Sequence, residues 1–445
     1  MRLLQRLAVA ALFGCHVFPL PAAVADQHWL LSIDRWGNAD YRILTLHRSG
    51  DVLTGRLGDW AVTGQQHGDL VRFTATDRHG DSYRFEGELE MGALRGHADY
   101  PDPNDSRARA RHDFNGRRLP DAPTGAPSPR VLEPVSFSNE FTAHRQPAMV
   151  IWPGEVVSTR TIDSGGVDRN GRTRALYGNP QTGPFFVAGA RPGDVLAVYI
   201  RRLGLNRDYA DSLDGFVGRA RSSGLAIASA GLGNRVRWHL DRENGVASLQ
   251  DPPARLKHYT VPLRPMLGGL AVAPDFGFAP ASTGDTGRFG GNMDFNGIVE
   301  GTTVYLPVLQ PGALLYLGDG HAAQGDGETT QWALETSLDV EFSVDVLPAR
   351  AVATPRIESD RALTTIGQAG SLDDALRVAT AGMVQWLEQD YGLDVRESSL
   401  ILGTAAEYRV VTLAGRNAGM ALSLPKARLQ ALRAETRGSS RPGHG

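Results

Sequence analysis

Gly183-Pro-Phe-Phe-Val-Ala-Gly-Ala-Arg-Pro-Gly-Asp-Val-Leu-Ala-Val-Tyr-Ile200 is a stretch in which turn residues alternate with short strand-forming runs. Pro192-Gly193-Asp194 has the composition of a tight turn, because glycine supplies the positive φ that such turns require. The pattern around it is therefore turn, strand, turn, strand. It predicts a mainly β fold, in the form of a β-dominated α+β domain with a few helices.

Upstream of this stretch, residues 26–100 show the alternation of apolar and polar residues that is typical of half-buried strands. Tyr41-Arg-Ile-Leu-Thr-Leu and Leu70-Val-Arg-Phe-Thr-Ala are examples, and glycine-containing turns separate such runs at intervals of about ten residues. We expect a small antiparallel domain here, either a meander or a small barrel. Residues 101–130 are rich in proline, which indicates a linker between this domain and the next.

Downstream, residues 131–430 are expected to form the main domain, and residues 431–445 a flexible polar tail. Residues 205–258 are mixed in composition and rich in Gly, Ser and Arg, so we interpret them as an insertion. One helix is predicted near the end, because apolar residues recur at helical spacing from Leu372 to Leu387. Ser371 is suited to cap its start, and Gly392 to end it.

The first 25 residues resemble a secretory signal peptide, with two arginines, an apolar stretch and the small-residue site Ala23-Val-Ala25. We therefore expect a periplasmic or secreted protein; retention by a lipid on Cys15 is the lesser alternative. The apolar stretch is shorter than the roughly 20 residues that span a bilayer. Cys15 is the only cysteine, so cleavage after Ala25 would exclude disulfides, thiolate metal sites and a cysteine nucleophile.

The composition indicates a globular protein with enough apolar residues for a core, since 41% of the 445 residues are hydrophobic and 21% are charged. The formal net charge of -3 gives no reason to expect a nucleic-acid partner.

Polar residues suited to chemistry are concentrated between Gly290 and Glu335. Asn292 and Asp294 are two residues apart, as are Asp319 and His321, so each pair would share one face of an extended backbone. Three interpretations are open for this segment. It can consist of hairpin turns, in which Asp319 and Asp326 only cap; it can bind a structural cation; or it can be catalytic.

A resemblance favours the third interpretation. Gly291-Asn-Met-Asp294, Pro311-Gly-Ala-Leu314 and Gly318-Asp-Gly-His-Ala-Ala-Gln-Gly-Asp-Gly-Glu328 resemble the acetamidase/formamidase family. So do Asn179-Pro-Gln-Thr-Gly-Pro184 and the upstream run that contains Asp163. The resemblance implies hydrolysis of a small linear amide to a carboxylate and ammonia, a bound divalent metal (zinc, with calcium as the alternative) and a homo-oligomer.

Amides are poor electrophiles, so the reaction needs an activated water and a proton donor for the nitrogen. We expect Asp294 and His321 to bind the metal, with Asp163 as a third ligand and His144 in reserve.

Glu328 is the expected general base and acid, with Glu335 as its substitute. Asn292 and Gln324 are expected to orient the amide, because each side chain both donates and accepts. A different class of function also stays open, because fold does not determine function: a non-catalytic periplasmic protein that binds a small ligand.

Overall fold

The computed structural model describes residues 26–432 except 106, 122, 124–128, 276–278 and 431. The predicted signal peptide with Cys15, and nearly all of the predicted tail at 431–445, lie outside the described residues. No helix in the part of the chain that is described is long and apolar enough to cross a membrane.

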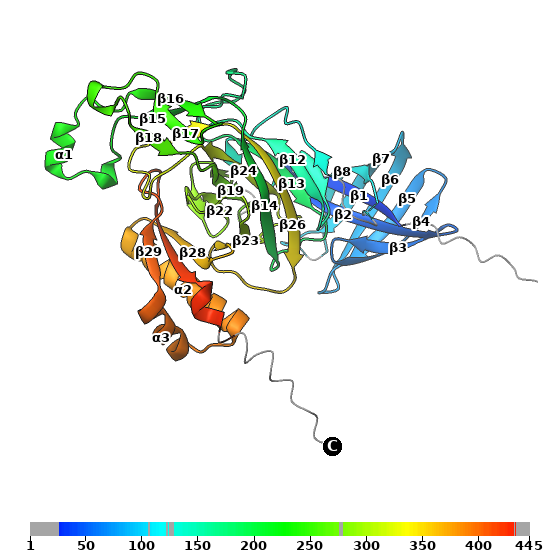
Figure 1. Ribbon diagram of the computed structural model, residues 1–445. Helices are drawn as coiled ribbons and strands as arrows, with labels where there is room; N and C mark the ends of the chain where they lie inside the picture. The colour runs from blue at the N-terminus through cyan, green and yellow to red at the C-terminus, as the bar shows by residue number, and fades with distance from the viewer. Residues whose placement is uncertain are drawn as a thin grey trace, which may run out of the picture.

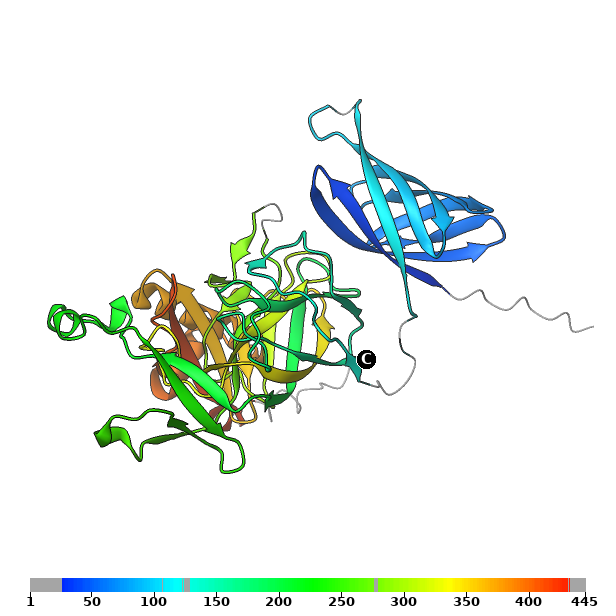
Figure 2. The ribbon, with the colours of Figure 1, turned by 90° about the horizontal axis from the view of Figure 1, so that it is seen from above.

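The N-terminal domain is a closed antiparallel barrel of eight strands in sequence order, and Figure 2 shows it beside the rest of the molecule. Its strands are β1 (Gln27–Arg35), β2 (Asn38–Ser49), β3 (Val52–Leu57), β4 (Trp60–His67), β5 (Leu70–Thr76), β6 (Ser82–Glu90), β7 (Ala93–Pro101) and β8 (Arg109–Leu119). Alternate residues such as Leu31, Ile33 and Leu44 fill its interior. The expectation of a meander or small barrel is confirmed.

The barrel continues past the predicted boundary at residue 100. Strand β8 pairs with both β7 and β1 and so closes the barrel with residues from the predicted linker 101–130. The linker prediction is therefore wrong for residues 109–119. Prolines occur on both sides of β8, at Pro103 and Pro120, and the alternating strand Arg109–Leu119 between them is free of proline.

The main domain contains two large sheets (Figure 1). The first, which we call the site sheet, has eleven strands: β11 (Met149–Ile151), β13 (Gln181–Val187), β15 (Tyr209–Leu213), β16 (Arg235–Asp241), β17 (Val246–Leu249), β18 (Thr260–Pro262), β19 (Met266–Ala271), β21 (Thr286–Gly287), β22 (Gly290–Asn292), β24 (Leu315–His321) and β25 (Glu335–Thr336). A separate pair consists of β10 (Glu140–Phe141) and β20 (Ala281–Ser282).

The second sheet has nine strands: β9 (Arg130–Val131), β12 (Val156–Arg160), β14 (Val195–Leu205), β23 (Thr303–Pro307), β26 (Leu338–Leu347), β27 (Arg356–Glu358), β28 (Ala362–Ala369), β29 (Glu407–Val410) and β30 (Ala418–Pro425). Buried apolar residues of both sheets form one core. Residues 183–200 contribute Phe185 to it from the first sheet and Leu196 from the second. The mainly β fold is thus confirmed, with the core between two sheets.

The predicted late helix is α2 (Leu372–Tyr391). Ser371 accepts a hydrogen bond from the Asp374 N–H at its start, and Gly392 ends it in the left-handed conformation, as expected. The other helices are α1 (Ser223–Ala228) and α3 (Val395–Ala405), with short 3-10 turns at η1 (Gly218–Ala220), η2 (Ala254–Leu256) and η3 (Lys426–Leu429).

The predicted insertion projects from the main domain as an arm, defined here as residues 206–262, which carries β15 to β18 and α1 (Figure 1). Its first strand, β15, pairs with β25 of the site sheet. The arm is therefore continuous with the sheet rather than a loose loop.

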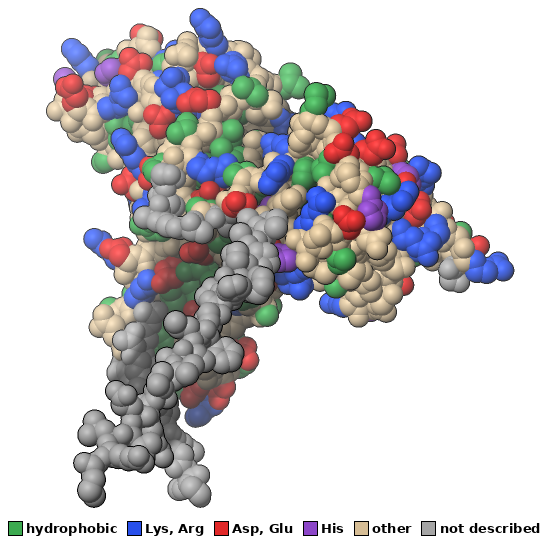
Figure 3. Space-filling view, turned by 90° about the vertical axis from the view of Figure 1, so that its right-hand side faces the viewer, with side chains coloured by type: hydrophobic (Ala, Val, Ile, Leu, Met, Phe, Trp, Pro, Cys, Tyr) green, Lys and Arg blue, Asp and Glu red, His purple; other side chains and the backbone are tan. Residues whose placement is uncertain are grey.

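On the face that Figure 3 shows, positive and negative side chains are interspersed. This agrees with a net charge close to zero, because neither sign of charge gathers into one field there.

Candidate functional site

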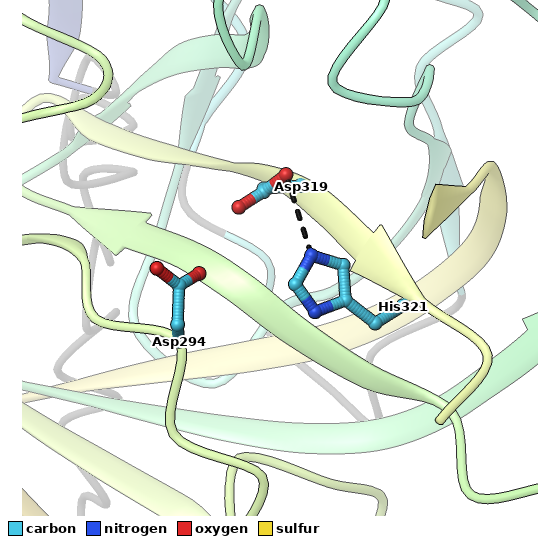
Figure 4. A group of neighbouring side chains, drawn as sticks. All are labelled: Asp294, Asp319 and His321. Carbon is cyan, nitrogen blue, oxygen red and sulfur yellow. Dashed lines mark ion pairs between the residues drawn. The ribbon is translucent and has the colours of Figure 1, made fainter. Parts of the chain in front are cut away.

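Five buried titratable side chains meet in the site sheet: Asp294, Asp319, His321, Glu328 and Glu335. Asp319 and His321 are two residues apart on β24, so they share one face of the strand, as expected (Figure 4). Glu335 lies opposite His321 on the neighbouring strand β25. Asp294 comes from the loop after β22, where its backbone N–H donates to the Gly268 carbonyl on β19.

Candidate ligand atoms lie within 4.8 Å of one another in two overlapping groups. One group is Asp294, Asp319 and His321, and the other is His321, Glu328 and Glu335. His321 Nε2 lies 3.2 Å from Glu335 Oε1 and 3.6 Å from Asp319 Oδ1. Four carboxyl groups around one imidazole would carry a large excess of buried negative charge if all were ionised, and water cannot screen it there.

The first group contains buried oxygen and nitrogen atoms that have no hydrogen-bond partner: Asp294 Oδ1, Asp319 Oδ1 and His321 Nε2. Buried polar atoms normally have a partner, so such atoms need an explanation. Both Asp294 and Asp319 also lie close to Gly268, where a Cβ would come within 2.6 Å of each carboxylate. Only glycine at this position leaves room for both carboxylates.

Gln324 fixes the orientation of His321. Its side-chain N–H donates to the backbone carbonyl of Asp294 at 2.5 Å, so its oxygen must face His321 Nδ1, which lies 2.7 Å away. Because that oxygen can only accept, Nδ1 carries a proton in this arrangement. When the ring is neutral, Nε2 is therefore the nitrogen that could bind a metal.

The pKa values of the cluster reflect burial and the mutual repulsion of its carboxylates. Burial and the charges of Glu328 and Asp319 raise the pKa of Asp294 well above its usual range. Burial raises the pKa of Glu328 to about 8. Burial also raises the pKa of Glu335, against the opposing effect of His321. For His321 burial lowers the pKa, but the charges of Glu335 and Asp319 outweigh it and raise that pKa well above 6.5.

The backbone of the site is strained. Asn179, Asp294, Asp319 and Glu328 have φ angles of 56°, 48°, 53° and 40°, in the left-handed region that residues other than glycine rarely adopt. Each such residue costs about 1–3 kcal/mol, and such strain is found mainly at functional sites. Four in one cluster support a function for it.

A cavity of about 160 Å³ opens onto the cluster. Asn292, Asp319, Glu328 and Glu335 line it, and the side chains of Tyr177 and Trp332 pair at its wall, with ring centroids 5.9 Å apart. This volume is small compared with the roughly 300–1,000 Å³ of pockets that hold drug-sized ligands. The cavity suits a molecule of a few heavy atoms.

The predicted site residues fall into two classes. The structure brings Asp294, His321, Glu328, Glu335 and Asn292 together at one place.

Asp163 and His144 have other partners. Asp163 forms a buried ion pair with Arg207 at 2.7 Å, and His144 Nδ1 contacts the Ala39 carbonyl of the barrel at 3.0 Å. Gln324 contacts His321 through its oxygen and the Asp294 carbonyl through one N–H, so its expected role in orienting the amide stays a prediction.

Asp319, for which turn capping was an open interpretation, lies in strand β24 within the cluster. Asp326 instead pairs with Arg409 and accepts a hydrogen bond from Asn296.

Sequence reasoning missed Asn179, which donates to Asn292 Oδ1 at 2.7 Å and to Asp319 Oδ2 at 3.3 Å. Its place in Asn179-Pro-Gln-Thr-Gly-Pro184 was the available signal. It also missed Arg207, which donates to the Glu335 carbonyl at 3.0 Å.

Comparisons with known proteins agree with this site. A model of the acetamidase/formamidase family matches residues 276–362, which contain all five clustered residues. A protein of Schizosaccharomyces pombe described as a candidate formamidase is 54% identical over 39 residues, which are 9% of this chain and 10% of that protein's length.

Solved structures match about two thirds of this chain and nearly the whole of their own length. A recombinant predicted acetamidase/formamidase from Thermoanaerobacter tengcongensis is 26% identical with a TM-score of 0.59, over 68% of this chain and 98% of that chain. An acetamidase from Yersinia enterocolitica is 26% identical with a TM-score of 0.60, over 68% and 93%. An acetamidase from Bacillus halodurans is 28% identical with a TM-score of 0.58, over 68% and 99%.

Proposed function

The chain belongs to the acetamidase/formamidase family, and from this premise we propose that it hydrolyses a small linear amide to a carboxylate and ammonia. The observation that carries the proposal is the set of unpartnered ligand atoms on Asp294, Asp319 and His321 beside a cavity of about 160 Å³. A cavity of that size takes formamide or acetamide together with a water molecule, and excludes bulky acyl groups.

The residues fit a divalent metal. Asp294, Asp319 and His321 each offer a ligand atom within 4.8 Å of the others, and each has a buried polar atom without a hydrogen-bond partner. A cation would balance the carboxylates that surround them. We assign Asp294, Asp319 and His321 to hold it. A nitrogen ligand with two carboxylates suits zinc better than calcium, which takes six to eight oxygen ligands. Such an ion lowers the pKa of water towards about 7 and polarises a carbonyl group.

Asp163, the ligand expected third, has a different role in this proposal. Its carboxylate is taken up by Arg207, whose guanidinium also holds the Glu335 carbonyl. Asp163 therefore fixes Arg207, and through it the backbone of the strand that carries Glu335. Asp319 takes its place among the ligands.

Glu328 is the proposed general base and acid. It lines the cavity, and its carboxylate accepts a hydrogen bond from Thr412 at 3.2 Å, which steadies it beside the metal ligands. In that position it takes a proton from the attacking water and returns one to the amide nitrogen as the carbon–nitrogen bond breaks. Glu335 lies against His321 and supports its orientation.

Asn292 is the remaining residue proposed to contact the amide. One of its N–H groups donates to Asp294 Oδ2 at 2.8 Å and its oxygen accepts from Asn179, which leaves the second N–H for the substrate carbonyl. A donor fixed in this way stabilises the negative charge that develops on that oxygen.

The direct test is ammonia release from formamide, acetamide and longer primary amides by the full chain. We expect turnover that falls as the acyl group outgrows the cavity. The Asp319→Asn variant should lose activity if Asp319 is a metal ligand, because asparagine lacks the carboxylate. If Asp319 only capped a turn, asparagine could replace it without loss. If no amide in the panel is hydrolysed while one of them binds saturably, the chain is a binding protein and the proposal is wrong.

A further inference from the structure

An open cavity lies between the arm and residues 323–334, next to the site. This arm cavity has a volume of about 510 Å³. The arm supplies Trp238, Tyr259 and Val261, while the facing segment supplies Leu334 together with polar residues such as Thr329. The arm side of the cavity is therefore apolar and favours an apolar group.

The arm cavity offers little to a charged ligand. The Trp238 indole N–H already donates to Ser212 Oγ at 2.9 Å. Asp326, one of its two charged wall residues, is neutralised by the guanidinium of Arg409. The other charged residue is Glu328. An aromatic or aliphatic group therefore matches these walls better than an ion does.

The two cavities adjoin each other, because Glu328 and Trp332 line both. The arm is also held firmly to the site. Strand β15 pairs with β25 at Asp211 and Glu335, and the buried guanidinium of Arg207 donates to the Glu335 carbonyl. The arm cavity is thus held next to the site, with the proposed proton donor Glu328 in the wall of both cavities.

We propose that the substrate is an N-substituted amide whose small acyl group occupies the site cavity and whose apolar nitrogen substituent occupies the arm cavity. The inference rests on the proposed function, in which Glu328 protonates the leaving nitrogen. Because Glu328 is shared by both cavities, the nitrogen lies at their junction. The acyl side then faces Asp319 and Asn292, where about 160 Å³ admits only a formyl- or acetyl-sized group.

Hydrolysis of an N-substituted amide needs water as its only co-reactant. The oxygen of water bonds to the carbonyl carbon, the carbon–nitrogen bond breaks with its electron pair going to nitrogen, and the nitrogen takes a proton. The products are a short carboxylate and an apolar primary amine, in place of the ammonia that formamide or acetamide gives.

Two isomeric substrates test whether the nitrogen substituent or the acyl group occupies the arm cavity. N-Benzylacetamide places the phenyl group on the nitrogen side, and 3-phenylpropanamide places it on the acyl side. We expect kcat/KM for N-benzylacetamide to exceed that for acetamide at least tenfold and to exceed that for 3-phenylpropanamide. The reverse order of the isomers would place the acyl group in the arm cavity and overturn the inference.

Two variants test the arm cavity itself. Trp238→Ala should lower kcat/KM for N-benzylacetamide at least tenfold, mainly through KM, and so lower the ratio of N-benzylacetamide to acetamide activity. Tyr259→Ala should lower the same ratio, and because Tyr259 is half exposed this change spares the arm's buried core. Ile227→Ala, at an exposed position on α1, is the matched control and should leave the ratio unchanged.

The possible failures are distinguishable. Hydrolysis of acetamide without hydrolysis of N-benzylacetamide, or a ratio that neither cavity variant changes, overturns this inference and leaves the proposed function standing. Absence of activity on every amide overturns the proposed function as well.

Discussion

At the scale of single residues, Glu328 is the proposed general base and acid, and Thr412 holds its carboxylate. Glu328→Gln keeps the size of the side chain and its acceptor for Thr412 but removes the exchangeable proton. We expect kcat to fall by about 10²–10⁴, the usual contribution of a general acid–base group, with an unchanged melting temperature. Ammonia release measures the rate, and Glu388→Gln, the same change at an exposed position on α2, is the control. Full activity of Glu328→Gln would remove it from the mechanism.

Gln324 is predicted to act through His321. Gln324→Met keeps the length of the side chain but loses the oxygen that faces His321 Nδ1. Metal affinity should fall by about 10–100-fold, as is typical when the partner of a metal-bound histidine is removed. Competition with a chelator measures this affinity. If the metal affinity were unchanged and KM for the amide were raised, Gln324 would instead orient the substrate.

The sequence was informative about which residues matter and less so about what each one contacts. The spacing of Asp319 and His321 correctly placed them on one face, because a strand has a period of two. The partners of Gln324 could not be predicted, because they depend on a loop that returns to Asp294, thirty residues away, and no local pattern records such a contact. The ion pair of Asp163 could not be predicted for the same reason, since Arg207 reaches it from the base of the arm.

At the scale of elements, close packing of α2 on β28 anchors the second sheet. Gly367 on β28 faces α2 so closely that a Cβ would lie 1.8 Å from the Ala375 carbonyl oxygen. Gly367→Ala should therefore destabilise the protein by about 1–3 kcal/mol, the usual range for overpacking. Thermal or urea denaturation checks this. Gly370→Ala is the control, because a Cβ there meets nothing within 4 Å. Equal stability of the two variants would contradict the packing described.

Elements with strong local signals were predictable, and those that depend on long-range pairing were not. Ser371 and Gly392 gave both ends of α2, because capping is local. Helix α3 was not predicted although it has an equally local start signal in Asp394 and Glu397, which form a capping box. Strand β8 was predicted to be part of the linker. It is a strand because it pairs with β1 and β7, and this pairing is not visible in the local sequence.

At the scale of the whole molecule, the barrel is docked on the main domain. Leu30, Tyr41 and Leu119 of the barrel pack with Val150 and Phe186 in one buried cluster. Composition alone predicted two domains but could not show this contact, because apolar residues on a barrel's outer face look like ordinary strand residues in sequence.

This contact predicts that the two domains unfold together. Scanning calorimetry of the full chain should show one transition, and Leu119→Asp, which places a charge in the interface, should split it into two. Val52→Asp, at an exposed barrel position, should leave one transition. Two separate transitions in the unaltered protein would show that the interface does not couple the domains.

We propose that amide hydrolysis depends on a divalent ion held by Asp294, Asp319 and His321. To test this, the metal content and the rate of acetamide hydrolysis are measured on one purified sample of the full chain before chelation, after chelation, and during titration with zinc. We expect activity to disappear with the ion and to return in proportion to the zinc bound, and we expect Asp319→Asn neither to retain the ion nor to recover activity. Metal-free protein that keeps its full activity would show that the ion is not needed.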